Sequence, residues 1–434
     1  MEMDSSKQST LPFPTESLPV DWKISTVGDC CISVNDGDWI ETKDQGGGDY
    51  RLLQISNVGL GVFRETGNYR YITQATFDRL SCREVLPGQI LVARMPDPTG
   101  RAWFVTPMDF RAITAVDVAI LEPDDAAIDG RYCAYYLNSQ YNLRHAKARA
   151  GGTTRERITR KDLAGFPLPV PPLPIQRRIA GVLLAYDELI ENCHRRIKIL
   201  ESMARALYRE WFVHFRFPGH ESVPRVPSPL GEIPQGWEVK PLADSFEISG
   251  GGTPSRKDAR YWEDGTIQWF SPSDLTGAGT MFMDDSGDHI TALGLAESSA
   301  RLFPARSVML TSRATIGAIA INTREACTNQ GFITCLPNER VPLFFLFHWV
   351  TENVPTFQRM ASGSTFKEIS RGVFKTIEFV QPPANLVWRF EDMAAPIAEQ
   401  ALVLQRQIQN LRHTRDLLLP RLLSGQIDVE AIAS

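Results

Sequence analysis

The sequence predicts a mixed α and β fold (α/β or α+β) that is built twice. Two globular, strand-rich domains are separated by two long helices that pair as an antiparallel coiled coil. Three observations predict this fold. A long segment recurs along the chain, each copy contains short β-branched runs punctuated by glycine and proline, and each copy ends in a heptad pattern. A tandem duplication with a pseudo-two-fold axis is the simplest arrangement.

The repeat is clearest near the end of each globular part. Residues 150–160 resemble residues 361–371 at an offset of 211 residues, which continues without a gap into the following helix. Near the start of each copy, residues 18–22 match residues 233–237 at an offset of 215. A repeat this long is not a solenoid unit, so it indicates duplication of a whole domain together with its helix.

Paired prolines mark the end of each globular part, because proline fixes φ and stops the preceding structure. They are Pro171-Pro172 and Pro382-Pro383. The predicted segments are a disordered leader (1–17), a first globular domain (18–172), a first helix (173–216), a linker rich in Pro, Ser and Gly (217–232), a second globular domain (233–383), a second helix (384–424) and a C-terminal tail (425–434).

Both helices carry apolar residues in alternating steps of four and three, which is the pattern of a coiled-coil seam. Each helix could instead pack only on its own domain, but matched seams in two copies favour pairing. At ~1.5 Å per residue each helix spans roughly 55 Å. The seam residues are Tyr186, Ile190, Cys193, Ile197, Leu200, Ala204, Leu207 and Trp211 in the first helix, and Ile397, Ala401, Leu404, Ile408, Leu411, Arg415, Leu418 and Leu422 in the second.

Composition excludes several classes of protein. The chain has 46 Lys and Arg against 51 Asp and Glu, a net charge of −5, so indiscriminate coating of nucleic acid is disfavoured and any DNA contact must use local basic patches. The sequence has no apolar stretch long enough to span a membrane and no signal peptide in residues 1–15. The seven cysteines form no C-x-x-C pair, so neither a structural zinc site nor a disulfide framework is expected.

Four strings, in order, resemble the specificity subunit of Type I restriction–modification systems. The resemblance covers roughly residues 18–428 and is looser in the first half, where residues 53–57 and 86–94 match best. The strings are ISGGGTPS (248–255) with IQWFSPSDL (267–275), TSRATIG (311–317) with TNQG (328–331), SGSTFKEIS (362–370), and LLLPRLLSGQI (417–427).

This resemblance implies a cytoplasmic, non-catalytic subunit that recognises DNA. Each globular domain would be a target-recognition domain that reads one half of a bipartite site, and the helices would set the spacer between the half-sites. The resemblance also implies two methyltransferase subunits as partners, which would methylate adenine N6 with their own S-adenosylmethionine, and a restriction subunit that completes the nuclease.

The motifs agree with a chain that lacks its own catalytic machinery. The nearest strings to an amino-methyltransferase loop are Gln381-Pro-Pro-Ala384 and Val170-Pro-Pro-Leu173, which lack the aromatic that would stack on a flipped base. The sequence contains no phosphate-binding loop and no metal-spaced histidine cluster. The runs Gly46–Gly48 and Gly250–Gly252 are interpreted as loops that let the backbone approach DNA closely.

Positive charge gathers in the same place in both copies. Residues 144–161 carry a net charge of +6 and residues 359–375 carry +3, which favours phosphate contact beside each Gly-Ser/Thr loop. Arginine suits guanine and Asn or Gln suits adenine, so nearby polar residues become candidate DNA contacts. These are Gln54, Ser56, Asn57, Arg94, Thr153, Thr154, Arg155, Arg157 and Arg160 in the first copy, and Ser271, Ser273, Asp274, Arg313, Thr315, Asn329, Gln330, Ser364, Lys367 and Arg371 in the second.

Two other functions fit the same pattern. A bivalent scaffold could bind protein or carbohydrate through its two globular domains, and DNA-binding assays would separate it from the DNA reader. A recognition subunit could also serve a methylation system that has no restriction subunit, which the neighbouring genes would decide.

Overall fold

The structure is a computed structural model that describes residues 18–152, 156–363 and 366–429. The chain divides into two compact units. Unit 1 comprises Met1–Glu191 and Gln409–Ser434, and unit 2 comprises Asn192–Ile408. The predicted leader lies outside the described residues. The division falls inside the long helices and not at the proline hinges, because each globular part packs against a stretch of both helices.

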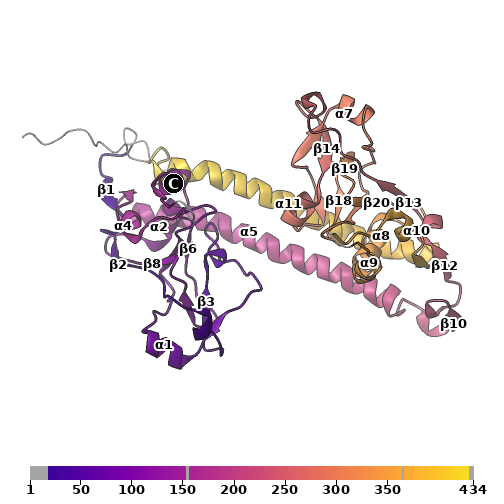
Figure 1. Ribbon diagram of the computed structural model, residues 1–434, viewed down its shortest axis with the longest axis horizontal. Helices are drawn as coiled ribbons and strands as arrows, with labels where there is room; N and C mark the ends of the chain where they lie inside the picture. Colours follow the sequence, from indigo (N-terminus) through magenta and orange to yellow (C-terminus); the bar gives the residue numbers. More distant parts are fainter. Residues whose placement is uncertain (1–17, 153–155, 364–365, 430–434) are drawn as a thin grey trace, which may run out of the picture. The chain divides into compact units, whose positions relative to one another are not determined.

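The described residues of unit 1 form three small sheets. Its central strands are continuous apolar runs that are buried on both faces, as a strand in the middle of a core should be. Figure 1 shows α1 (Gln74–Leu80) at the end of the domain far from the long helices. The strands, in sheet order, are β2 (Cys31–Asn35), β8 (Val118–Pro123), β5 (Ile90–Ala93) and β6 (Ala102–Phe104); β4 (Tyr71–Ile72), β3 (Tyr50–Leu53) and β7 (Ala112–Thr114); and β1 (Lys23–Thr26) with β9 (Pro167–Val170).

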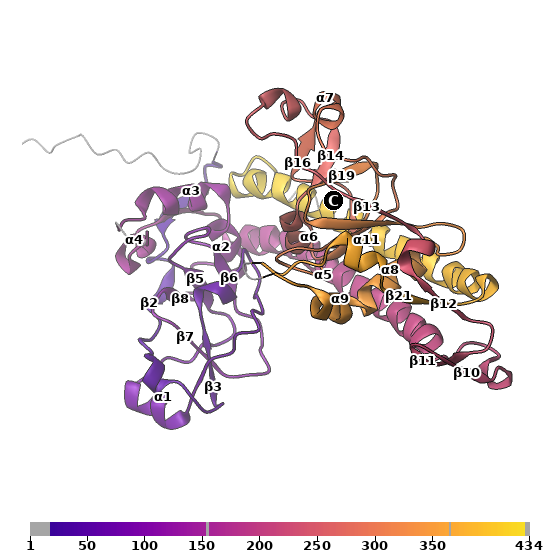
Figure 2. The same ribbon diagram turned by 45° about the vertical axis from the view of Figure 1, so that its right-hand side comes forward.

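Unit 2 repeats this plan. In Figure 2, α7 (Ala292–Ala296) and the β14 sheet lie away from the helices, whereas α8 (Leu343–Glu352) and α9 (Val354–Met360) lie beside them. The strands, in sheet order, are β13 (Glu247–Gly250), β20 (Phe332–Leu336), β17 (Val308–Thr311), β18 (Ile319–Asn322) and β15 (Phe282–Met283); β16 (Asp288–Ile290), β14 (Ile267–Phe270) and β19 (Ala326–Thr328); and β12 (Glu238–Pro241) with β21 (Glu378–Gln381).

The two units share strand order and strand direction. The order β2-β8-β5-β6 corresponds to β13-β20-β17-β18, and β4-β3-β7 corresponds to β16-β14-β19. The pairs β3–β7 and β14–β19 are both parallel, while the neighbouring pairs are antiparallel. Unit 2 adds β15 at one sheet edge, and the linker forms a hairpin of β10 (Arg225–Ser228) and β11 (Gly231–Pro234). The predicted duplication and mixed fold class are therefore confirmed.

Both predicted long helices are present. Helix α5 (Leu173–Tyr208) begins in unit 1 and ends in unit 2, where a short π-helical turn (Arg209–Val213) follows it, and α11 (Ala384–Leu423) begins in unit 2 and ends in unit 1. Every predicted seam residue, Arg415 included, is buried or half-buried.

The helices pack on each other within each unit. In unit 1, Arg415 Nη1 donates to Asp187 Oδ1 at 2.5 Å, and in unit 2 the rings of Tyr208 and Phe390 meet edge-on with centroids 5.8 Å apart. Residues early in α5 therefore face residues late in α11, and the reverse, as in an antiparallel pair. The alternative in which each helix packs only on its own domain is wrong.

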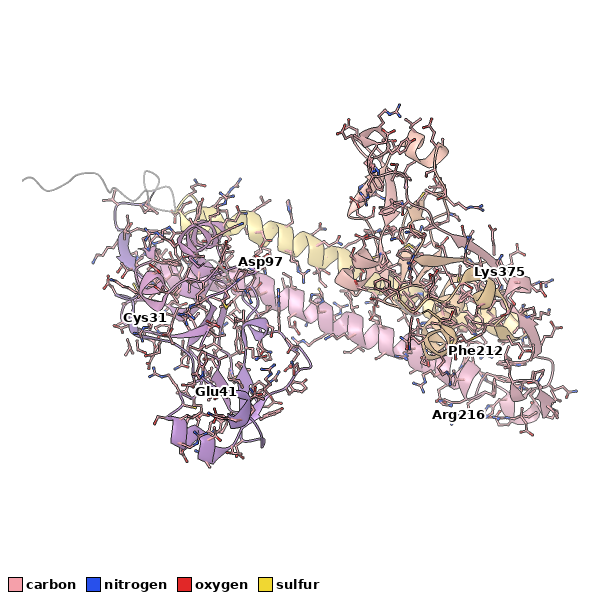
Figure 3. The ribbon with its side chains drawn as sticks, viewed as in Figure 1. Cys31, Glu41, Asp97, Phe212, Arg216 and Lys375 are labelled. Atoms are coloured by element: carbon pink, nitrogen blue, oxygen red, sulfur yellow. The ribbon has the colours of Figure 1, made fainter. Side chains whose placement is uncertain are left out.

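Each core is completed by the helix end that comes from the other repeat. Leu422 and Leu423 belong to the core of unit 1, and Trp211 and Phe212 belong to the core of unit 2. The ring of Phe212, which is labelled in Figure 3, lies 4.8 Å from that of Phe345, centroid to centroid. These two pairs of residues correspond at the repeat offset of 211.

Candidate nucleic-acid interface

A groove lies at the same place in each unit, where β5 ends and β8 begins in unit 1, and where β17 ends and β20 begins in unit 2. Strand register defines the correspondence, since Ala93 pairs with Val118 and Thr311 pairs with Phe332. Groove 1 has a volume of about 520 Å³ and is lined by Trp39, Met95, Val116, Asp117, Arg149, Gly151, Gly152, Arg157, Thr159 and Asp162. Groove 2 has a volume of about 340 Å³ and is lined by Pro272, Arg313, Ala314, Asn329, Gln330, Gly331 and Phe366.

The basic loop beside each groove is closed by the same pair of backbone hydrogen bonds. Gly151 and Arg157 exchange N–H···O bonds of 3.1 and 2.9 Å, and Ser362 and Glu368 exchange bonds of 3.0 and 2.8 Å. The predicted contacts Thr153, Thr154, Arg155 and Ser364 sit inside these two loops and lie outside the described residues. The closure holds both ends of each loop at the rim of its groove.

Groove 2 brings together candidates from separate parts of the sequence. Arg313 follows β17, and Asn329 and Gln330 follow β19. The Arg313 side chain is about half exposed, and its Nε lies 3.7 Å from a carboxylate oxygen of Glu368. Thr315 and Lys367 are exposed nearby, and the Lys367 carbonyl accepts from Ala314 N at 3.0 Å. These groups could meet an anionic backbone and base edges together.

Local hydrogen bonds already fix part of this polar set. Asn329 Oδ1 accepts from Gly331 N at 2.8 Å, which orients the amide, and Gln330 Oε1 accepts from the Thr253 hydroxyl at 2.6 Å. Both amides are held at the rim of the groove by their carbonyl oxygens. These bonds fix the orientation of both amides at the groove.

The candidates Gln54, Ser56 and Asn57 correspond in position to Ser271, Ser273 and Asp274. Each trio starts a helical turn after a buried strand, η2 (Ile55–Asn57) or α6 (Pro272–Ala278). Gln54 N donates to Asn57 Oδ1 at 2.9 Å, and Ser271 N donates to Asp274 Oδ2 at 2.7 Å. Among the other members of these trios, Ser56 and Ser273 are exposed and Gln54 and Ser271 are half-buried, so all four stay candidate contacts.

Asn57 and Asp274 require correction. The buried Asn57 also donates to Arg64 O at 3.0 Å, and Asp274 Oδ1 accepts from Gly287 N at 3.0 Å. Both polar ends of each side chain are therefore engaged within the protein. They cap the turn that positions the neighbouring serine, so their polar atoms serve the local fold.

Arg94 also requires correction. Only 2% of it is exposed, and its Nη2 donates to Val116 O at 2.5 Å and pairs with Asp36 Oδ1 at 3.0 Å. Burial lowers the pKa of its guanidinium. The register shows that Arg94 corresponds to the buried Ser312, whereas the exposed Arg313 corresponds to Met95. Successive side chains along a strand point to opposite faces, so this shift of one residue turns Arg94 inward.

The other basic candidates remain at the surface. Arg157 is about half exposed and pairs with Asp117 Oδ1 at 3.0 Å, and Arg160 is exposed in the first turn of α4 (Arg160–Ala164). Arg371 opens the corresponding helix α10 (Arg371–Lys375), and its guanidinium lies over Gly250. Lys375, labelled in Figure 3, ends that helix. Positive charge thus borders both grooves.

The interpretation of the second glycine run was wrong. A Cβ on Gly251 would lie 2.0 Å from the carbonyl oxygen of Asn329, and one on Gly252 would lie 2.2 Å from Ser299 Oγ. These glycines let two protein segments pack closely, so they support the loop that carries Asn329. Around Gly46 and Gly48 an added Cβ meets nothing within 4 Å.

The sequence interpretation missed two groove residues, Trp39 and Phe366. Both are large aromatic side chains in loops that are otherwise glycine-rich and polar, and this contrast is the signal that could have found them. Within the described ranges no group of His, Cys, Asp and Glu could hold a metal ion. No helix in the described part of the chain is long and apolar enough to cross a membrane.

Comparison with known proteins adds a family assignment. A family model described as the Type I restriction modification DNA specificity domain matches residues 19–202 and 234–386. The HindI specificity subunit of Haemophilus influenzae is 23% identical over 407 residues, which cover 80% of this chain and 88% of that subunit.

Two further matches extend the comparison. The MjaIX specificity subunit of Methanocaldococcus jannaschii is 32% identical over 186 residues, which span 41% of this chain and only 43% of that subunit. The crystal structure of an S subunit from M. genitalium superposes with a TM-score of 0.57 at 16% identity, and the alignment covers 94% of this chain and 98% of that one.

Proposed function

The chain belongs to the family of Type I restriction–modification DNA specificity proteins, and from this membership we propose that it recognises a bipartite DNA target. Each unit reads one half-site through its groove. The observation that carries the proposal is the recurrence of the groove: the same strand ends, the same loop closure and the same bordering charge hold different side chains in the two units. A shared scaffold with different contacts suits two different half-sites.

The proposed division of labour leaves chemistry to partner subunits. Two methyltransferase subunits dock on the helices and supply S-adenosylmethionine for adenine N6 methylation, and a restriction subunit completes the nuclease in the cytoplasm. The net charge of −5 fits a chain that gains much of its DNA affinity inside such a complex.

The direct test is methylation mapping. Cells that express this chain with a partner methyltransferase subunit should show adenine methylation at one split motif, and the purified chain alone should methylate nothing. Exchanging the loop residues of groove 1 should alter one half of the motif and leave the other half unchanged. Methylation by the isolated chain, or a motif that is not split, would contradict the proposal.

The spacer role has its own test. We propose inserting seven residues into each helix at the unit boundaries, after Glu191 in α5 and after Ile408 in α11. A whole heptad keeps the seam in phase, so both units remain intact. At ~1.5 Å per residue the insertion adds roughly 10 Å, or about three base pairs of 3.4 Å, to the spacer. An unchanged spacer in the mapped motif would refute the ruler role.

A further inference from the structure

Four aromatic side chains are exposed among the residues that the structure describes: Trp39, Tyr69, Phe366 and Trp388. Tyr69 lies under the guanidinium of Arg51, 4.4 Å from its ring centroid, and Trp388 Nε1 donates to Glu339 O at 2.9 Å. The two others line the grooves, Trp39 in groove 1 and Phe366 in groove 2. Exposed aromatic rings without a packing role therefore concentrate at the candidate interface.

The exposure of these two rings is large. Trp39 is 70% exposed, and its Nε1 donates a long hydrogen bond of 3.4 Å to Glu41 Oε1. Phe366 is 58% exposed. Leaving rings of this size in water is unfavourable, so isolated ones beside a functional groove indicate a surface that becomes covered on binding. Glu41, the acceptor of that bond, is labelled in Figure 3.

Each ring lies among cations. Groove 1 places Arg149 and Arg157 in the same lining as Trp39, and groove 2 places Arg313 in the same lining as Phe366. A flat apolar ring next to guanidinium groups matches a partner that is anionic along its backbone and presents flat faces. Nucleic-acid bases between phosphates have this chemistry.

The two rings come from different positions in the repeat. Asp38 N donates to Thr114 O at 2.8 Å and Gly252 N donates to Thr328 O at 2.9 Å, so Trp39 corresponds to Thr253. Phe366 lies in the loop closed by Ser362 and Glu368 and corresponds, at the offset of 211, to a residue of the first basic loop. Each groove therefore has one exposed ring, but the two rings come from different loops. The shared scaffold alone does not explain why both grooves have a ring.

We propose that Trp39 and Phe366 are DNA wedges: each ring inserts at a base step within the half-site of its own unit and stacks on the base that this opens. The inference rests on the proposed DNA-recognition function and deepens it. Opening a step costs unstacking energy that depends on sequence, and pyrimidine–purine steps open most easily. The rings therefore add readout of deformability to the hydrogen bonds made by the polar residues.

The test uses the full chain with its methyltransferase partner and duplexes that carry the mapped target. Trp39→Ala and Phe366→Ala should each weaken specific binding about tenfold or more, because stacking on one base contributes at that level. Trp39→Phe should stay within a few-fold of wild type. Tyr69→Ala and Leu302→Ala are the controls, since they remove exposed apolar side chains outside the grooves and should leave affinity unchanged.

Two readouts distinguish a wedge from a phosphate contact. The wedge variants should keep the wild-type slope of log affinity against log salt, whereas Arg157→Ala should reduce that slope by about one. A mismatch that is moved step by step through a half-site should tighten wild-type binding at the step where the ring inserts, because the base pair there is already open. In Trp39→Ala this gain should vanish in the half-site of unit 1 and remain in the half-site of unit 2.

The outcomes separate this inference from the proposed function. Wild-type affinity in both alanine variants, or a loss that comes with a reduced salt slope, would overturn the wedges while target recognition stands. If the wild-type complex shows no preference for the mapped target, the proposed function fails and the wedges fail with it. The exposed positions of both rings predict unchanged melting temperatures, so lost binding will report the interface.

Discussion

The ion pair in the helix seam of unit 1 allows a quantitative test. Arg415 Nη1 lies 2.5 Å from Asp187 Oδ1, and the Tyr135 hydroxyl donates to Asp187 Oδ2 at 2.6 Å. The side chains of Asp187 and Arg415 are 29% and 27% exposed. The pair therefore lies between an exposed ion pair, worth about 0–1 kcal/mol, and a buried one, whose disruption costs about 3–5 kcal/mol.

The expected magnitudes follow from these contacts. Asp187→Ala removes an acceptor from two donors and should cost about 3 kcal/mol, and Arg415→Ala should cost about 2 kcal/mol. The double variant should fall short of the sum by a coupling energy of about 1–2 kcal/mol. For a unit of this size, 1 kcal/mol corresponds to roughly 2–4 °C in the melting temperature.

Calorimetry of the four full-length chains measures the coupling. The matched control is the exposed pair of Glu210 and Arg216, the second of which is labelled in Figure 3, with the same 2.5 Å separation but side chains 46% and 56% exposed. There the coupling should be much smaller than in the seam, and it should disappear at 1 M salt. The seam pair should keep most of its coupling at 1 M salt. A seam coupling no larger than that of the control would refute the reasoning.

Three more predictions follow from buried groups. Arg94→Ala should lower the melting temperature by several degrees, because it leaves Asp36 and Val116 O unpaired, whereas Arg157→Ala should weaken DNA binding and leave melting unchanged, as calorimetry and titration would show. Burial lowers the pKa of His348 to about 4 from 6.5, so the contribution of its neutral ring to the stability of the fold is complete above pH 6.5 and is lost as the pH falls towards 4. Thermal melts should show this loss of stability in the wild type but not in His348→Phe. Gly251→Ala should lower both stability and DNA affinity, while Gly48→Ala should change neither in the same assays.

The architecture was accessible from the sequence because it rests on periodic patterns. The heptad steps predicted the seam residues, including Arg415, and the offset of 211 predicted a duplication that the strand order confirms. Both signals depend on spacing alone, and spacing is preserved in the fold. The partner of Arg415 was not predictable, since no pattern connects it with Asp187, 228 residues away.

The candidate site was harder to predict because the type of a residue does not reveal which way its side chain points. Arg94 and Arg313 follow similar strands, yet a shift of one residue places the first inside the domain. Asn57 and Asp274 were chosen as polar groups in loops, but capping uses the same groups. Residues that line a groove come from loops far apart in sequence, which is why Trp39 and Phe366 emerged only from the structure.

The exchange of helix ends between the repeats has an evolutionary consequence. Leu422 and Leu423 complete unit 1, and their counterparts Trp211 and Phe212 complete unit 2, so a chain with one repeat would need a second copy of itself to bury either core. The protein thus has the construction of a homodimer whose subunits became joined. The copies then diverged in the seam: the positions of Asp187 and Arg415 correspond to the buried Ala398 and Ala204. If two copies of the first repeat paired, Asp187 would face Ala204, and if two copies of the second repeat paired, Arg415 would face Ala398. The ion pair therefore favours the pairing of two different repeats.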